Sequence, residues 1–211
     1  MENSHISASP EHRAAHAELL DAERELWESV EHVVALRRAL PPGPPIDPAT
    51  PLTTATGKPV TLGGLLGRHR TLLLYLMAFD DGRPAPHPAC VLQVDCLDAL
   101  VPHLAARAAV AVLAPARPGR LADLGARRGW RRVPLVSTQP SRLAEHLALP
   151  DEDGPGGGVH CLALDEHGVL RLRYRTRGRG GPEDLVTTVL ALLDPLLPEP
   201  PREGTDGQPG S

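Results

Sequence analysis

The pattern of apolar and polar positions predicts an α/β order over most of the chain. The run from Thr71 to Phe79 is almost entirely apolar, and its length is typical of a strand buried on both faces. Beyond it, segments with helical spacing alternate with short apolar segments, which indicates parallel strands joined by crossover helices. The expected elements are a hairpin over 52–62, helices over 89–106, 120–128, 141–147 and 182–193, and strands over 110–113, 133–136, 159–164 and 169–176.

The first forty residues have a different pattern. Leu19, Leu26 and Val30 recur at helical spacing among charged residues, and Ser9 followed by Pro10 is a suitable helix start. We therefore expect a long N-terminal helix over 10–40, a stiff proline-rich connector over 41–51 and a single domain over 52–195. Residues 1–9 and 196–211 have too few apolar side chains to offset the entropy of ordering, so we expect them to be disordered.

Composition narrows the classes of partner. The 211 residues suit one domain, and because only 2% are aromatic, Leu, Val and Ala must fill most of the core. A net charge of −4 gives no global field that would gather nucleic acid or anionic lipid, so we expect neither a nucleic acid nor a membrane partner. The N-terminus lacks the apolar core of a secretory signal, and three cysteines are too few for a secreted disulfide framework. A cytoplasmic protein with reduced thiols is the expectation.

The predicted order of elements is that of a thioredoxin-like fold, in which a mixed central sheet is flanked by helices. Many short segments, in order, also resemble one family of that fold, the domain of unknown function 899, which is related to the peroxiredoxins. The similarity runs over roughly residues 18–195. Its segments are AERELWE, RRALP, GKPVTLGGLLG, RRGW and PLVST, and its single positions are Cys90, Asp95, Asp98, Pro102, His103, Leu104, Arg107, Tyr174, Thr176, Arg179 and Gly180.

The resemblance implies an active loop where the central strand leads into the next helix. Relatives commonly carry a Cys-Pro-x-Cys pattern there, whereas this chain has His87-Pro88-Ala89-Cys90. An imidazole cannot form the disulfide that dithiol exchange requires. The histidine therefore argues against a thioredoxin-type reductase.

Cys90 is the first candidate catalytic residue. In the first turn of a helix, unpaired backbone N–H groups and the helix dipole stabilise a thiolate, and His87 three positions earlier can add positive charge or accept a proton. The alternative is a small buried cysteine that only fills space. Cys96 lies almost two turns further along the helix, so it is a poor disulfide partner for Cys90.

His160 and Cys161 open a strand that runs beside the active loop in a thioredoxin fold, and only one of the two can face Cys90. If His160 does, then His87, Cys90 and His160 form a nitrogen and sulfur ligand set suited to copper, zinc or iron. Otherwise His160 is an ordinary strand residue and Cys161 a core residue. Whether a metal cofactor is present stays open.

Arginines alternate with other residues over 171–179, which is typical of a strand with one positive face. This face is either solvated or binds an anionic substrate, and Arg179, which matches the family pattern, is the candidate substrate-binding residue. Asp95 also matches the family and is a candidate supporting residue.

Three functions remain possible at this level. The first is a thiol-dependent oxidoreductase in which Cys90 reacts with a small molecule or a thiol substrate. The second is a metal-dependent oxidase or oxygenase that uses His87 and Cys90 as ligands, together with His160 if that side chain faces the site. The third is a non-catalytic binding module, because one fold hosts many functions. The sequence leaves the oligomeric state open.

Overall fold

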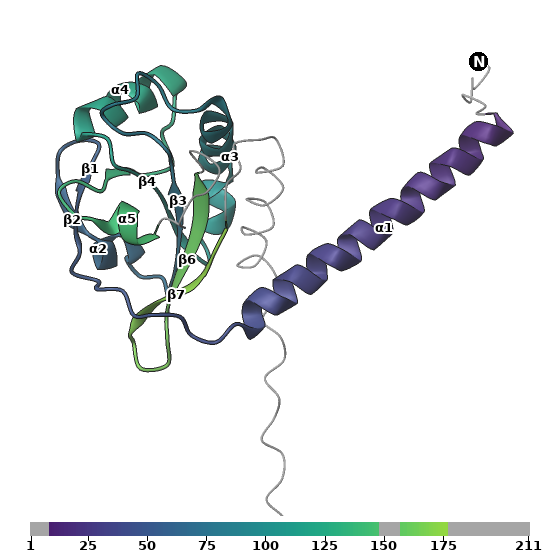
Figure 1. Cartoon of the computed structure of the whole chain (residues 1–211), viewed down its shortest axis with the longest axis horizontal. Helices are drawn as coiled ribbons and strands as arrows, with labels where there is room; N and C mark the ends of the chain where they lie inside the picture. Colours follow the sequence, from purple (N-terminus) through teal and green to yellow (C-terminus); the bar gives the residue numbers. More distant parts are fainter. Residues whose placement is uncertain (1–8, 148–156, 177–211) are drawn as a thin grey trace, which may run out of the picture. The chain divides into compact units, whose positions relative to one another are not determined.

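The computed structural model describes residues 9–147 and 157–176 (Figure 1). The chain divides into two compact units, Met1–Pro41 and Pro42–Ser211. In the first unit, helix α1 spans Pro10–Ala39. The Ser9 hydroxyl accepts a hydrogen bond from the N–H of His12 at 3.2 Å, and Pro10 occupies the first turn, where its missing N–H costs nothing.

Within the described residues, the second unit contains one sheet of seven strands in the order β2-β1-β5-β4-β3-β6-β7. The neighbours β3/β4 and β4/β5 are parallel and the other pairs are antiparallel. The strands are β1 Pro51–Thr54, β2 Pro59–Thr61, β3 Thr71–Leu76, β4 Ala109–Ala114, β5 Leu135–Ser137, β6 Gly158–Leu164 and β7 Leu170–Arg175, and the helices are α2 Leu62–Leu66, α3 Pro88–Leu104, α4 Pro118–Arg128 and α5 Leu143–Leu147.

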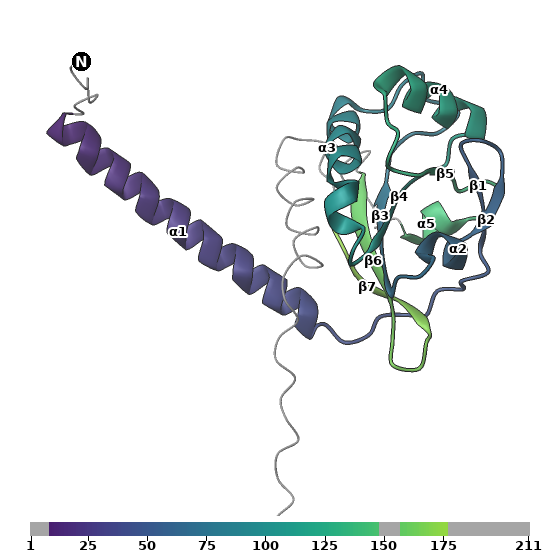
Figure 2. The same cartoon turned by 180° about the vertical axis from the view of Figure 1, so that it is seen from behind.

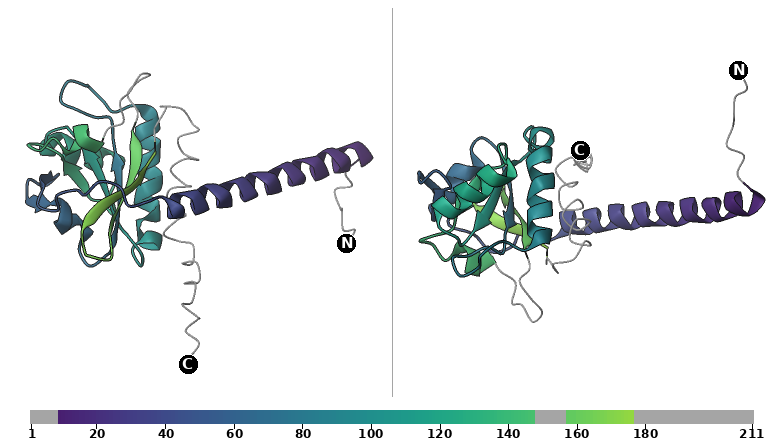
Figure 3. Two further views of the ribbon diagram at one scale, coloured as in Figure 1. Left: turned by 60° about the horizontal axis from the view of Figure 1, so that its bottom comes forward. Right: turned by 90° about the horizontal axis from the view of Figure 1, so that it is seen from above.

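Helices cover both faces of this sheet. Strand β3, the predicted central strand, lies inside the sheet between β4 and β6, and its side chains alternate between the two faces. Leu73 and Tyr75 pack in one apolar cluster with residues of α3 and α4, whereas Leu72 and Leu74 pack in a second cluster with residues of α2 and α5. Figures 1 and 2 show α3 on one side of β3 and α2 and α5 on the other, and Figure 3 shows α3 along its face of the sheet. The central strand is thus buried on both faces, as its apolar run predicts.

The boundaries differ from the predictions by a few residues. Strand β3 ends at Leu76 rather than Phe79, although the N–H of Met77 still bonds to the carbonyl of Leu113 at 2.8 Å. Helix α3 begins at Pro88 and ends at Leu104, earlier than the predicted 106. The helix expected over 182–193 lies outside the described residues.

The proline-rich segment after α1 forms backbone hydrogen bonds with strand β7. The N–H of Gly43 bonds to the carbonyl of Leu172 at 3.1 Å, the N–H of Leu172 bonds to the carbonyl of Pro44 at 3.2 Å, and the N–H of Ile46 bonds to the carbonyl of Leu170 at 2.9 Å. The segment therefore pairs with β7 and covers that edge of the sheet, which protects an otherwise open strand.

Candidate functional site

Cys90 lies in the first turn of α3, two residues after Pro88. The loop over 77–87 brings the chain there from the end of β3. Because the first N–H groups of a helix have no intrahelical acceptor, they point toward this end of α3 and create a local positive potential. The Cys90 residue is 3% exposed and packs in the same cluster as Tyr75 and Phe79. The structure therefore places Cys90 at a helix start beside the central strand, where the sequence predicts it.

His87 caps this helix. Its backbone is extended, with φ −62° and ψ 141°, and its Nδ1 accepts a hydrogen bond from the N–H of Ala89 at 3.3 Å. An acceptor nitrogen carries no proton, so this contact assigns the proton of the neutral ring to Nε2. In this arrangement His87 satisfies a backbone donor of the first turn, and accepting a proton from Cys90 at Nδ1 requires the ring to leave Ala89.

The structure does not bring His160 to this site. On β6, Val159 and Cys161 belong to the cluster that contains Cys90, whereas Leu162 belongs to the cluster on the opposite face. His160 alternates with Val159 and Cys161, so it points away from Cys90. The ligand set His87, Cys90 and His160 therefore does not assemble, because a strand presents successive side chains to opposite faces.

His160 has its own buried environment near α5. It is 2% exposed; its Nε2 lies 2.8 Å from the carbonyl oxygen of Leu147, and its Nδ1 lies 3.2 Å from that of Gly158. Burial lowers the pKa of His160 below its usual value, although the two carbonyls oppose this shift; the charge of Arg175 adds to it. A neutral ring donates one proton, so one of the two carbonyl contacts is not a hydrogen bond.

The loop before His87 is attached to α4 through Asp81. Its carboxylate accepts a hydrogen bond from the N–H of Arg117, the N-cap residue of α4, at 3.0 Å, and it also pairs with the guanidinium of Arg117. The Arg117 backbone N–H is the main reason that the pKa of Asp81 lies below its usual value. A carboxylate at a helix start interacts favourably with the dipole, so Asp81 joins the active loop to α4.

Two carboxylates of α3 have structural partners. Asp95 accepts a hydrogen bond from Nε1 of Trp130 at 2.7 Å and pairs with the guanidinium of Arg128. Asp98 is 6% exposed, and its Oδ1 accepts bonds from three consecutive backbone N–H groups, those of Arg131, Arg132 and Val133, at 3.0, 2.7 and 2.9 Å. Both tie α3 to the segment between α4 and β5. The sequence shows only a family match at Asp98, since its acceptor role depends on a distant turn.

The arginines of β7 are not a uniform positive face. Arg171 pairs with Asp165 at 2.6 Å and donates a hydrogen bond to the carbonyl of Gly43 at 3.2 Å. It therefore stabilises the β6–β7 hairpin and the pairing of the proline-rich segment with β7. Arg179, the predicted substrate-binding residue, lies outside the described residues.

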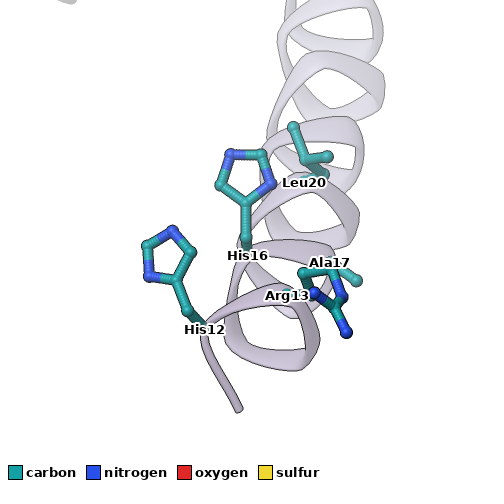
Figure 4. Close-up of a pocket in the computed structure, with 5 residues that line it drawn as sticks. All are labelled: His12, Arg13, His16, Ala17 and Leu20. Carbon is teal, nitrogen blue, oxygen red and sulfur yellow. The ribbon is translucent and has the colours of Figure 1, made fainter. Parts of the chain in front are cut away.

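A separate hollow lies on α1 (Figure 4). His12, Arg13, His16, Ala17 and Leu20 line it, and the rings of His12 and His16, one turn apart, have centroids 6.2 Å apart. Over residues 9–147 and 157–176, no group of three or more His, Cys, Asp or Glu side chains is placed to hold a metal ion. Two imidazoles are fewer than the three or four ligands typical of zinc sites, so the residues of this hollow do not form a zinc site.

Among the helices that the structure describes, none is long and apolar enough to cross a bilayer.

Several solved structures that are similar to this chain are described as peroxiredoxins or peroxidoxins. A cysteine-to-serine mutant of Xanthomonas campestris peroxiredoxin Q matches with a TM-score of 0.52 at 20% identity, over 72% of this chain and 95% of that one. The peroxidoxin BcpB of Mycobacterium tuberculosis matches with a TM-score of 0.53 at 16% identity, over 73% and 96% of the two chains. The bacterioferritin comigratory protein of X. campestris, whose structures concern its alkyl peroxide reduction activity, matches with a TM-score of 0.51 at 19% identity, over 72% and 98%.

These likenesses show the fold, and the chain has the thioredoxin-like architecture that its sequence predicts. A search of curated proteins gives no match. A family model described as bacterial protein of unknown function (DUF899) matches residues 1–199, and the chain belongs to this family.

Proposed function

We propose that this protein is a thiol-dependent oxidoreductase that reduces a peroxide with Cys90 as its reacting group. The observation that carries the proposal is the position of Cys90 in the first turn of α3, next to the His87 cap. Backbone N–H groups and the helix dipole favour an anion at this point, and the thiolate is the nucleophilic form of cysteine.

The chemistry is a two-electron oxidation of sulfur. The Cys90 thiolate attacks one oxygen of the peroxide, the O–O bond breaks, and an alcohol or water leaves after taking up a proton, so the peroxide is reduced and Cys90 becomes a sulfenic acid. An external thiol then attacks the sulfenic sulfur and water leaves, which gives a mixed disulfide. A second external thiol releases the Cys90 thiol and leaves as the disulfide of the two external thiols, which balances the cycle.

Burial favours a small oxidant. Cys90 is 3% exposed, so a folded disulfide protein cannot contact its sulfur in this conformation, and a hydroperoxide, being small, is the better candidate oxidant. The alkyl peroxide activity named for the X. campestris protein supports the same substrate class, although at 19% identity it assigns no residue roles here. We therefore propose a hydroperoxide as the substrate.

The metal-dependent alternative has weaker support. His160 was its third candidate ligand, and His160 lies on the other face of the sheet, near Leu147. The ligands left at the loop are then His87 and Cys90, and His87 Nδ1 already accepts the N–H of Ala89.

The test compares the three cysteines of one chain. Reduced protein is treated with hydrogen peroxide or an alkyl hydroperoxide, sulfenic acid is trapped with dimedone, and each site is quantified by mass spectrometry. Cys96 is more exposed than Cys90, and Cys161 is similarly buried. The comparison with Cys96 therefore shows whether exposure controls the rate of oxidation, and the comparison with Cys161 shows whether Cys90 is more reactive than another buried thiol. We expect Cys90 to be oxidised about tenfold faster than either, because thiolate character governs the rate.

Cys90→Ser should abolish peroxide consumption, whereas Cys96→Ser and Cys161→Ser should preserve it. If Cys96 reacts fastest, exposure alone controls oxidation. Cys90 is then a packing residue, and the binding-module interpretation is the better one.

A further inference from the structure

Arg120 of α4 binds the loop that leads to the candidate site. Its Nη1 donates to the carbonyl oxygen of Asp80 at 2.7 Å, and its Nη2 donates to those of Arg83 at 2.6 Å and Pro84 at 3.3 Å. The guanidinium carbon also lies 4.6 Å from the centroid of the Phe79 ring. One side chain therefore hydrogen-bonds to or stacks on four of the six residues from Phe79 to Pro84.

This use of Arg120 matches the geometry of a guanidinium. Its fixed fork of donors can serve several carbonyls at once while its flat face stacks on an aromatic ring, and an ammonium cannot reproduce both contacts. The nearest carboxylate, on Asp81, lies 3.8 Å from Nη1, farther than the carbonyl oxygens of Asp80 and Arg83. Loop carbonyls are thus the principal partners of this cation.

The link from this anchored loop to the site is short and stiff. Only Ala85 and Pro86 separate Pro84, the last residue that Arg120 holds, from His87. Proline fixes its own φ and restricts the residue before it, so the alternating prolines at 84, 86 and 88 limit the directions in which the chain can enter α3. Phe79, on which Arg120 stacks, belongs to the same buried cluster as Cys90. Fixing the loop therefore fixes the approach to the helix cap.

We infer that Arg120 is a positioning residue for Cys90: by holding the loop over 79–84 it keeps His87 on the N–H of Ala89 and the first turn of α3 in the geometry that activates the thiol. This inference rests on the proposed function for its chemical consequence. Its structural consequence, an ordered helix cap, is independent of peroxide chemistry. The two are therefore measured separately.

The first measurement is the rate of Cys90 oxidation by hydrogen peroxide and its pH profile. Arg120→Met retains an apolar stem against Phe79 but removes every donor. We expect oxidation at neutral pH to slow about two- to tenfold, which is the range that helix-terminus interactions supply, and the half-maximal rate to move to higher pH. Arg120→Lys, which restores the charge and some donors, should be intermediate.

The matched control is Arg142→Met. Arg142 is exposed and pairs only locally with Glu145 in the described structure, so the same change of charge and shape should leave the Cys90 rate and pH profile unaltered. A variant that merely loosens the fold would also increase the reactivity of buried Cys161. We expect Cys161 to remain slow in Arg120→Met.

The second measurement is hydrogen exchange of the Ala89 backbone N–H, which donates a hydrogen bond to Nδ1 of His87. We expect it to exchange several-fold faster in Arg120→Met and to be unchanged in Arg142→Met, because opening of the cap exposes this donor. Unchanged Ala89 exchange, or an unchanged Cys90 rate and pH profile in a reactive protein, would overturn the inference. If wild-type Cys90 does not react with peroxide, the proposed function fails, and the exchange measurement alone decides whether Arg120 positions the cap.

Discussion

Asp98 is the carboxylate whose removal should affect the described fold most. In Asp98→Ala, the N–H groups of Arg131, Arg132 and Val133 lose their common acceptor. The bond to Val133 is buried, so leaving that donor unpaired costs about 1–3 kcal/mol, and the two partly buried donors can recruit water at a loss of about 0.5–1 kcal/mol each. We therefore expect the free energy of unfolding to fall by about 2–5 kcal/mol.

Asp98→Asn separates the charge from the acceptor. The amide oxygen can still accept from the three backbone donors, but the charge beside Arg132, 3.6 Å away, is lost. We expect a smaller decrease, about 1–2 kcal/mol, since bonds to charged groups exceed neutral ones by roughly that amount. The measurement is urea unfolding followed by circular dichroism, with exposed Asp123→Asn as the control, for which we expect a change within about 0.5 kcal/mol.

The pH dependence gives a further check on Asp98. Burial alone would raise the pKa of this carboxyl, but the backbone N–H groups of Val133, Arg132 and Arg131 outweigh it and hold the pKa below the usual 3.8. Because the pKa of Asp98 is lower in the folded state, the carboxylate stabilises the fold fully at a pH above its pKa in the unfolded state. This stabilisation is lost as the pH falls through its pKa in the folded state. The gap between wild type and Asp98→Asn should therefore shrink below about pH 4. A loss under about 1 kcal/mol in Asp98→Ala, or a gap independent of pH, would refute the buried-acceptor account.

Two further substitutions test the edge segment and the buried imidazole. Gly43→Ala should lower the free energy of unfolding by about 1–3 kcal/mol, because its Cβ would lie 2.2 Å from the carbonyl oxygen of Leu172 and separate the segment from β7. Gly119→Ala, where a Cβ meets nothing within 4 Å, is the control in the same denaturation series, and equal effects would contradict the pairing. For His160, burial lowers the pKa of the folded protein below the usual 6.5, so the unfolded state binds more protons. The free energy of unfolding should therefore fall as the pH drops from about 6.5 toward the pKa of His160 in the folded state. His160→Gln should weaken this dependence in melting experiments between about pH 7 and 5, and an unaltered slope would show that other groups cause it.

Local patterns predicted the parts of the fold that depend on burial. The run from Thr71 to Phe79 identified the central strand, because a strand buried on both faces must be apolar throughout. The Gly- and Pro-rich segment before Cys90 correctly indicated a loop entering a helix. The pairing of Gly43 with Leu172 was missed, since those residues are far apart in sequence and nothing local specifies the partner of an edge strand.

The candidate site was predictable in position but not in its contacts. The orientation of His160 depends on strand register, and a shift by one residue exchanges the two faces of a strand. The anchoring by Arg120 was also invisible, because its partners are backbone carbonyls, which every residue has. Asp98 lies on a helix, where most carboxylates are solvated, so its three-donor role emerges only when the turn before β5 is placed against α3.

The histidine at position 87 connects the fold to the chemistry. In relatives that carry a Cys-Pro-x-Cys pattern, the resemblance places the first thiol at this position, which here is the cap of α3 and lies outside the helix. The imidazole of His87 accepts the hydrogen bond of the Ala89 N–H and so still caps the first turn of α3. It has no sulfur, however, so residue 87 cannot form a disulfide with Cys90. Cys96 does not replace it, because six residues along a helix amount to roughly 9 Å of axial rise, beyond the span of a disulfide. In the proposed cycle, oxidised Cys90 is reduced by an external thiol, so the rate of its recovery should rise with the concentration of that thiol; a rate independent of the added thiol would contradict this step.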